Sequence, residues 1–336
     1  MAKREFLLNS KTLDWLLEKN NPSVRYFTLV DILDRSEKDT EANEARDEIM
    51  EGPLVTKILS KQKGPGFWEE PKKFYMAKYK STVWQLMILA ELGARGGNER
   101  VQKACEFILN NAQDRKSGGF SIAGTGKTGG APSGVIPCLS GNMVWSLIKF
   151  GYLKDPRVEH GIQWITTYQR FDDGTKKPPK GWPYDKWEMC WGHHACHMGV
   201  VKSLKALSEI PAGLRTKEVK SALAQSIEYL LKHRVYKRSH DLRRVSKPGW
   251  LKFGFPLMYQ TDVLEIMGLL TKLGSKDGRM QEAMDLVISK QDEKGRWKLE
   301  NSYNGRFHAN IERKGKESKW VTLHALRVLK RFHAGR

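Results

Sequence analysis

The hydrophobic positions of this chain recur with helical spacing and fall into two alternating kinds of segment. One kind is apolar at most of its positions, which is typical of a helix buried on several sides. The apolar segments span 24–33, 81–92, 138–150, 194–207, 259–273 and 319–332. Because these segments recur along the whole chain, we expect a repeated helical hairpin.

The second kind of segment is amphipathic and lies between the apolar ones. These segments span 10–18, 41–62, 98–113, 155–169, 216–234 and 277–291. Asp155-Pro156 predicts the start of one helix, and Gly93, Gly151 and Gly274 predict the ends of others. Six helices of each kind predict an all-α fold, an (α/α)6 toroid or barrel with an inner and an outer ring. We expect one domain over 1–336, with a flexible glycine-rich insertion at 118–134.

A shared motif ends several amphipathic segments. Gln62, Gly66 and Trp68 follow the pattern Q-x-x-x-G-x-W, and the same pattern returns at residues 291–297. Looser copies begin at Gln113 and Gln169. In these motifs the sequence resembles the squalene cyclase and protein prenyltransferase β-subunit superfamily, whose toroids carry such repeats. The resemblance covers the whole chain and implies a single toroid with a central cavity.

Charge and cysteine content narrow the class of protein. The 336 residues carry a net charge of +20, so polyanions such as nucleic acid are candidate partners, although no recognition motif for nucleic acid is present. Four cysteines are too few for a disulfide scaffold, and no apolar run has the length of a membrane span. We therefore expect a cytoplasmic protein without a transmembrane segment. A solvated basic surface explains the charge equally well.

In a toroid of this kind we expect the cavity mouth at the N-terminal ends of the inner helices. Helix N-termini favour anions, and the aromatic residues near these ends could line an apolar cavity. We therefore expect a hydrophobic or anionic small molecule as the substrate. The candidate substrate-binding residues near those ends are Arg25, Tyr26, Tyr79, Trp191, Lys319 and Trp320. The candidate catalytic residues are His194, Asp262, Tyr259, Cys138 and Asn142. Asp262 suits a general acid or base, or a helix cap, and Cys138 suits a reactive thiol or a core position.

The densest chemical cluster spans residues 188–197, E-M-C-W-G-H-H-A-C-H. His193 and His197 stand four residues apart and can share one helix face, and Cys190 can add a thiolate, so zinc is the expected metal. A metal-free, hydrogen-bonded cluster remains the alternative. The resemblance adds two ligands, because prenyltransferase β subunits use an Asp-x-Cys motif and a later histidine. Here Glu188-Met189-Cys190 resembles that motif, and His324 lies on a later inner helix.

Three functions remain open from the sequence. The first is a prenyltransferase- or terpenoid-cyclase-like enzyme with an isoprenoid-type substrate and a Cys/His metal cluster. The Asp-x-Asp-Asp acid of class II triterpene cyclases is absent, because only Asp172-Asp173 and an isolated Asp262 are present. The second is a lyase for an acidic polysaccharide, using Tyr259, His194 and Asn142 with Arg25. The third is a non-enzymatic toroid that binds a polyanion.

Overall fold

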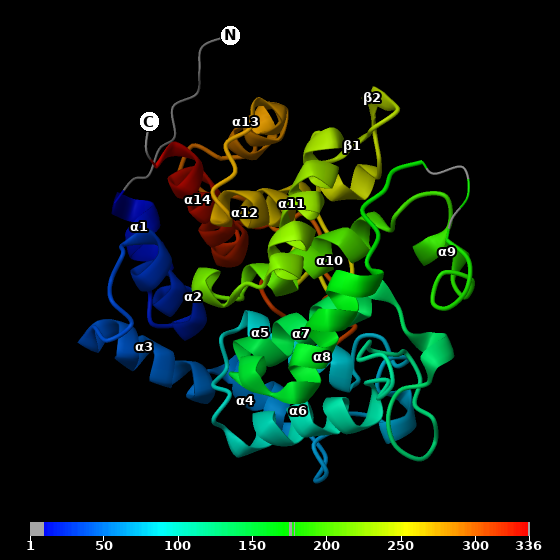
Figure 1. Ribbon diagram of the computed structural model, residues 1–336. Coiled ribbons are helices and arrows are strands. Elements are labelled where there is room, and N and C mark those ends of the chain that lie inside the picture. The colour runs from blue at the N-terminus through cyan, green and yellow to red at the C-terminus, as the bar shows by residue number, and fades with distance from the viewer. Residues whose placement is uncertain (1–9, 175–176, 178, 335–336) are drawn as a thin grey trace.

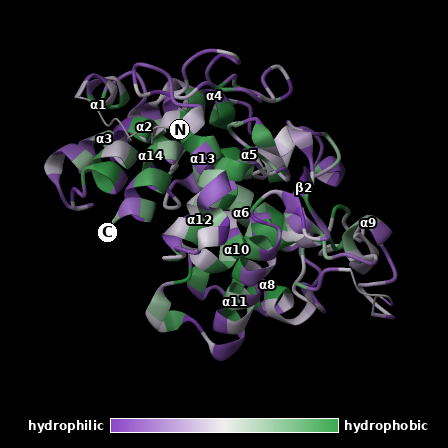
Figure 2. Cartoon of the chain, turned by 90° about the horizontal axis from the view of Figure 1, so that it is seen from above, coloured by the Kyte–Doolittle hydropathy of each residue, from purple (hydrophilic) through white to green (hydrophobic). Residues whose placement is uncertain are grey.

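The computed structural model describes residues 10–174, 177 and 179–334. The described chain is mostly helical, which confirms the all-α prediction (Figure 1). The strands in this part of the chain form one antiparallel pair, β1 (Lys237–Arg238) and β2 (Asp241–Val245). In Figure 2 the hydrophobic positions gather on the helices, while many connecting segments are hydrophilic. No described helix combines the length and the apolar character that crossing a membrane requires.

The apolar segments form the helices of the core, here called the core helices. They are α2 (Pro22–Phe27) with its π-helical continuation η1 (Thr28–Ile32), α5 (Thr82–Glu91), α7 (Pro137–Lys149), α10 (His197–Ser208), α12 (Val263–Lys272) and α14 (Lys319–His333). From α5 to α14 each core helix contacts the next, and α14 contacts α2, the first of them. Nine of the ten residues of α5 are buried, as expected for a helix surrounded by other elements.

The amphipathic segments form the helices that cover the core. They are α1 (Ser10–Leu16), α3 (Thr40–Glu51), α4 (Pro53–Ser60), α6 (Glu99–Asn111), α8 (Pro156–Tyr168), α11 (Lys217–Lys232) and α13 (Gln281–Ser289). The segment predicted at 41–62 is two helices, because Gly52 adopts an extended conformation and Pro53 starts a new helix. Asp39, Asn98 and Asp155 cap their helices by accepting backbone hydrogen bonds.

The two close copies of the Q-x-x-x-G-x-W motif make the same contacts. Trp68 and Trp297 are fully buried, and each indole Nε1 donates to the carbonyl ten residues earlier, at 2.8 and 2.7 Å. Their backbone N–H groups donate to the Oγ1 atoms of Thr82 and Thr322 on the following core helices. Gly66 has φ +97°, and a Cβ there would lie 2.4 Å from a carbonyl oxygen of α6. The motif thus ties a covering helix to the next hairpin.

The glutamines of the motif link successive covering helices. Gln62 Nε2 donates to the carbonyl of Arg100 in the first turn of α6, at 2.8 Å. Gln113 Nε2 donates to the carbonyl of Arg157 in the first turn of α8, at 2.7 Å. First-turn carbonyls have room for a second acceptor contact, so each glutamine fixes the position of the next helix.

Three local features were not predicted. The short helix α9 (Glu188–Trp191) precedes α10, and the hairpin of β1 and β2 follows α11 (Figure 1). Within 118–134, a bridge pairs Gly124 with Gly130, and Trp182 Nε1 donates to the Pro132 carbonyl. The flexibility expected for this segment stays a prediction.

Candidate active-site cavity

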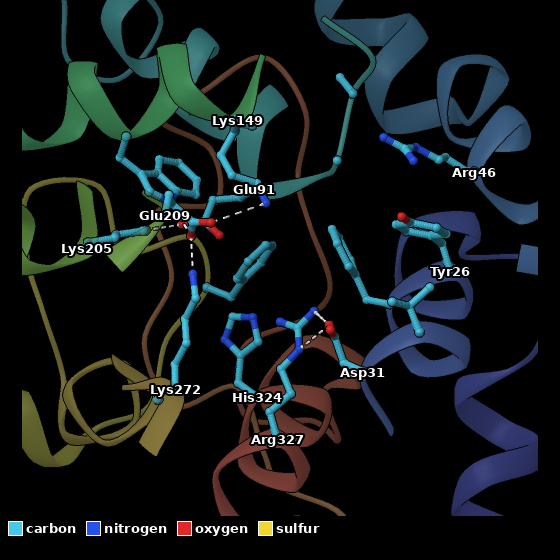
Figure 3. A pocket seen from close by; sticks show the side chains of 18 of the residues that line it. Tyr26, Asp31, Arg46, Glu91, Lys149, Lys205, Glu209, Lys272, His324 and Arg327 are labelled. Atoms are coloured by element: carbon cyan, nitrogen blue, oxygen red, sulfur yellow. Dashed lines mark hydrogen bonds and ion pairs between the residues drawn. The ribbon is translucent and has the colours of Figure 1, made fainter. Parts of the chain in front are cut away.

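A half-enclosed cavity of about 920 Å³ lies among the core helices. Its wall includes the ends of several of them: Glu91 ends α5, Lys149 ends α7 and Lys272 ends α12. From α10 and α14 the wall includes Lys205 and Arg327 (Figure 3). The wall thus includes the C-terminal ends of α5, α7 and α12, together with Leu264 and Glu265 from the first turn of α12 and His324 from the first half of α14, whereas the mouth was expected at the N-terminal ends of the inner helices.

Part of the cavity wall is apolar. Aromatic and aliphatic side chains from five helices and from the loop before α12 contribute to it: Tyr26, Phe27, Val30, Met50, Trp145, Phe255, Leu257, Leu264 and Leu269. Gly268 of α12 also lines the cavity, and a Cβ built there would meet nothing closer than 3.9 Å. The lining therefore offers hydrophobic contact area together with space beside α12.

Glu209 gathers cationic side chains on one wall (Figure 3). Lys272 Nζ lies 2.7 Å from one carboxylate oxygen, Lys149 Nζ lies 3.9 Å from the other, and Trp145 Nε1 donates at 3.3 Å. Burial opposes ionisation of Glu209, but Lys149 and Lys272 outweigh it, so the pKa of this carboxyl is lowered. Glu209 is therefore an ionised acceptor and not an acid with a proton to give at neutral pH.

A second ion network crosses from α10 to α12. Lys202 Nζ lies 2.8 and 2.7 Å from the two carboxylate oxygens of Glu265, and Lys205 pairs with Glu265 at 3.3 Å and with Glu91. Lys205 also lies 3.9 Å from the ring centroid of Trp145. Burial favours the neutral carboxyl of Glu265, yet the two lysines lower its pKa. The network therefore places charged side chains in this wall, and each of them has an oppositely charged partner.

The wall formed by α14 carries two arginines in different situations. Arg327 is paired with Asp31, to which its Nε donates at 2.8 Å, and it lies over the ring of Phe27. Arg331 also lines the cavity, and no described residue forms a hydrogen bond or ion pair with its guanidinium. Burial and the charge of Arg327 lower the pKa of Arg331. The charges of Asp31 and Glu209 act on it in the opposite direction but make no direct contact with it, so the guanidinium can bind an anionic group at the cavity wall.

His324 projects into the cavity beside Arg327 (Figure 3). Its ring contacts Phe255 and Trp320, with centroids 5.6 and 6.2 Å away. Burial and the charge of Arg327 hold the pKa of this imidazole well below its usual range, so the ring is neutral at neutral pH. A neutral imidazole offers one acceptor and one donor nitrogen.

Two of the residues predicted from the sequence, Tyr26 and His324, line the cavity. Asp262 is buried and caps α12, accepting hydrogen bonds from the backbone N–H groups of Glu265 at 2.8 Å and Gly254 at 2.9 Å. Burial raises the pKa of Asp262 to about 7. Of the two roles predicted for Asp262, helix cap and general acid or base, these contacts are those of the helix cap.

Four of the side chains predicted to bind substrate, two cationic and two tryptophan, contact other residues of the fold. Arg25 pairs with Glu41 at 3.0 Å and Glu48 at 3.6 Å, and Lys319 pairs with Glu18 at 2.8 Å. Trp191 and Trp320 are both buried, Trp191 against Trp164 and Tyr184 and Trp320 stacked on Phe255. These four side chains are packed or paired, and their substrate contacts stay a prediction.

Two other predicted residues, Tyr79 and Tyr259, belong to an aromatic group before α5 and α12. Their ring centroids lie 6.5 Å apart, and Trp84 lies against both rings. The Lys78 ammonium lies 4.8 Å from the Tyr259 centroid. Asn142 is nearby in the fold, because its Nδ2 donates to the Met258 carbonyl at 3.4 Å.

The histidines and the cysteines of residues 188–197 form two groups with different neighbours. His194 Nδ1 lies 3.3 Å from Asp173 Oδ1, while the ring of His197 packs against Tyr229, His233 and Trp250. Glu188 and His193 are exposed at the surface.

The thiols form the second group. A hydrogen bond between the side chains of Cys190 and Cys196 raises the pKa of Cys190 and lowers that of Cys196 to about 7. Cys138, in the first turn of α7, is buried close to Cys196. The burial of Cys138, and to a smaller extent the charge of Cys196, raises the pKa of Cys138 to about 12.

A metal site would need three or more suitable ligands around one point. In the part of the chain that the structure describes, no group of three His, Cys, Asp or Glu side chains is arranged to hold a metal ion. The zinc site of Cys190, His193, His197, Glu188 and His324 therefore stays a prediction, and we assign no step to a metal.

The charged residues of the cavity were missed by the sequence analysis. A signal for them exists, because Glu91, Lys149 and Lys205 are charged positions near the C-terminal ends of otherwise apolar helices. Basic residues there also complement the helix dipole, so this signal alone does not distinguish a cavity from a helix end.

Comparison with known proteins gives matches among solved structures only. No protein-family model and no curated protein sequence matches this chain. The type II terpene cyclase MstE from Scytonema is 15% identical with a TM-score of 0.42, over 92% of this chain and 87% of that one. A protein from Actinoplanes is 13% identical with a TM-score of 0.43, over 94% and 89%. Likeness at this level carries no information on activity.

Proposed function

We propose that this chain is a prenyltransferase- or terpenoid-cyclase-like enzyme that binds an isoprenoid-type substrate in the cavity of the core helices. The observation that carries the proposal is the cavity, whose volume of about 920 Å³ lies within the range of small-molecule sites. Its aromatic and aliphatic wall suits an apolar chain. The motif resemblance is consistent with this reading, and it implies the (α/α)6 toroid.

The toroid is part of the proposal. Its support is the order of helix contacts, which runs from α5 through α7, α10 and α12 to α14 and then reaches α2. Core helices that contact one another in this order, with α14 next to α2, can surround a central space. The cavity of about 920 Å³ is that space in our proposal.

The charged wall suggests which end of the substrate points where. Arg331 has no partner among the described residues, and the ammonium of Lys149 lies 3.9 Å from its nearest carboxylate. A substrate with an anionic group and an apolar chain would place its anion at these cations and its chain against Phe27 and Phe255. His324, which is neutral and has one unprotonated ring nitrogen, would accept a hydrogen bond from the bound substrate.

A cavity-filling substitution tests this proposal. Gly268→Phe extends a ring from the middle of α12 into the cavity, where the backbone leaves space. The matched control is Gly213→Phe, at an exposed position with nothing within 4 Å. The probes are farnesyl and geranylgeranyl diphosphate and the corresponding alcohols, with binding followed by titration calorimetry and products by mass spectrometry.

We expect the wild-type protein and Gly213→Phe to bind at least one probe and Gly268→Phe to bind it at least tenfold more weakly. Absence of binding by every probe, or equal binding by Gly268→Phe, would overturn the proposal.

A second candidate function is polyanion binding, and the hairpin of β1 and β2 favours it. Arg234, Arg244 and Lys247 are exposed around this hairpin, and none forms an ion pair with a described residue. Binding by these side chains would release counterions, so the affinity for a DNA duplex should fall steeply with salt. Fluorescence anisotropy at two salt concentrations tests this, and salt-independent or absent binding contradicts it.

A further inference from the structure

Three of the four cysteines meet where two core helices begin. Cys190 lies in α9, Cys196 immediately precedes α10, and Cys138 lies in the first turn of α7. The starts of α7 and α10 are pressed together, since a Cβ on Gly199 would lie 2.9 Å from Pro137 Cβ. The thiols of Cys190 and Cys196 share a hydrogen bond, and both cysteines are free.

The segment between the two hydrogen-bonded cysteines is held in place by its neighbours. The buried guanidinium of Arg170 donates to the carbonyls of residues 191 and 192, both at 2.6 Å, and pairs with Asp172. Ala195 donates its N–H to the Asp172 carbonyl, and its own carbonyl accepts from the Tyr229 hydroxyl, both at 3.2 Å. The short loop is thus fixed at both ends, which keeps the two sulfurs side by side.

The four cysteines differ in accessibility. Cys190 and Cys196 are partly exposed, so a small oxidant can reach them, whereas Cys105 and Cys138 are buried. Adjacent, accessible thiols whose connecting loop is preorganised form a disulfide more readily than isolated thiols do.

We propose that Cys190 and Cys196 are a redox-active dithiol that a peroxide converts to a disulfide. One sulfur, as thiolate, attacks a peroxide oxygen, so that an S–O bond forms, the O–O bond breaks and hydroxide leaves as water after taking up a proton. The second sulfur then attacks the sulfenic sulfur, an S–S bond forms, the S–O bond breaks and a second water leaves. The two sulfurs lose two electrons, and hydrogen peroxide gains them.

The test uses the full chain, reduced, desalted and treated with equimolar hydrogen peroxide. Free thiols are then alkylated with iodoacetamide, and the digest is analysed by mass spectrometry. We expect a peptide crosslinked between Cys190 and Cys196, its loss after dithiothreitol treatment, and full alkylation of Cys105 in the denatured sample. The matched control Cys138→Ser should form the same crosslink, whereas Cys190→Ser should carry sulfenic or sulfinic acid at Cys196.

Three results would overturn the proposal. The first is separate alkylation or overoxidation of both cysteines without a crosslink. The second is a crosslink to Cys138 in place of the expected one. The third is co-purified zinc that protects both thiols until a chelator removes it, which would assign them to a metal site. None of these measurements depends on a ligand in the cavity, so the outcome is independent of the proposed enzyme function.

Discussion

Replacing Glu265 by Gln should destabilise the fold through the lysine that it neutralises. The Lys202 side chain is fully buried, and its Nζ lies 2.7 and 2.8 Å from the Glu265 carboxylate. Glutamine keeps the shape of the side chain and removes the charge. Removing one partner of a buried pair costs about 3–5 kcal/mol, because the other charge stays buried without compensation. Lys205 retains Glu91 as a partner and is expected to lose less.

Lys202 can limit that cost by losing its proton. In the unfolded chain its pKa is 10.5, so deprotonation at pH 7 costs about 1.4 kcal/mol per pH unit, or about 5 kcal/mol. The stability that Glu265→Gln loses through Lys202 at pH 7 is therefore at most about 5 kcal/mol. If Lys202 is neutral in the folded variant, the unfolded state binds more protons, and the variant gains stability as pH rises. The loss at pH 9 should therefore be about 2 kcal/mol.

Urea unfolding followed by tryptophan fluorescence and circular dichroism, at pH 7 and pH 9, measures both effects. The control is Glu228→Gln, whose partner is Arg279 at 2.8 Å and whose side chain is 63% exposed. That control should cost less than about 1 kcal/mol at either pH. A loss for Glu265→Gln below about 1 kcal/mol at pH 7, or an equal loss at both pH values, would refute the reasoning.

Two further predictions concern Asp262 and the tryptophan of the repeated motif. Burial raises the folded pKa of Asp262 from 3.8 to about 7, so its contribution to stability is present below pH 4 and is lost as pH rises to 7. Asp262→Asn should remove this slope in thermal midpoints measured from pH 4 to 8; an unchanged slope contradicts the assignment. Trp297→Phe should cost about 2–4 kcal/mol in urea unfolding, because part of the buried indole and its hydrogen bond to the Val287 carbonyl are lost. Trp187→Phe, at a half-buried position, should cost about 1 kcal/mol or less.

The positions of the helices could be predicted from local patterns. The apolar segment at 138–150 became α7, and the amphipathic segment at 98–113 became α6, each within a residue or two at either end. Helical spacing and caps such as Asn98 act over one or two turns, so they are visible in the sequence. The break at Gly52-Pro53 has the same local origin, although the two short helices were predicted as one.

The candidate site depended on packing that no local pattern records. Tyr26 and His324 were predicted and line the cavity. The mouth was expected at the N-terminal ends of the core helices, whereas the wall of this cavity includes the C-terminal ends of α5, α7 and α12. Apolar helices look alike at both ends, and a lysine in a last turn serves equally as a dipole complement or as a cavity wall. The pairing of Lys202 with Glu265 joins residues 63 positions apart. A pattern within one segment does not identify such a partner.

By itself, then, the sequence determined the all-α class and the alternation of buried and covering helices, because hydrophobic spacing of 3.6 residues expresses burial directly. It also determined that cysteine and histidine gather at residues 188–197. Only the tertiary structure decided which of these groups meet: Cys190 lies beside Cys196, whereas His324 faces the cavity with Arg327. The reason is physical, since contacts between distant segments depend on how helices pack, and close approaches such as Gly199 on Pro137 arise only when the chain is folded.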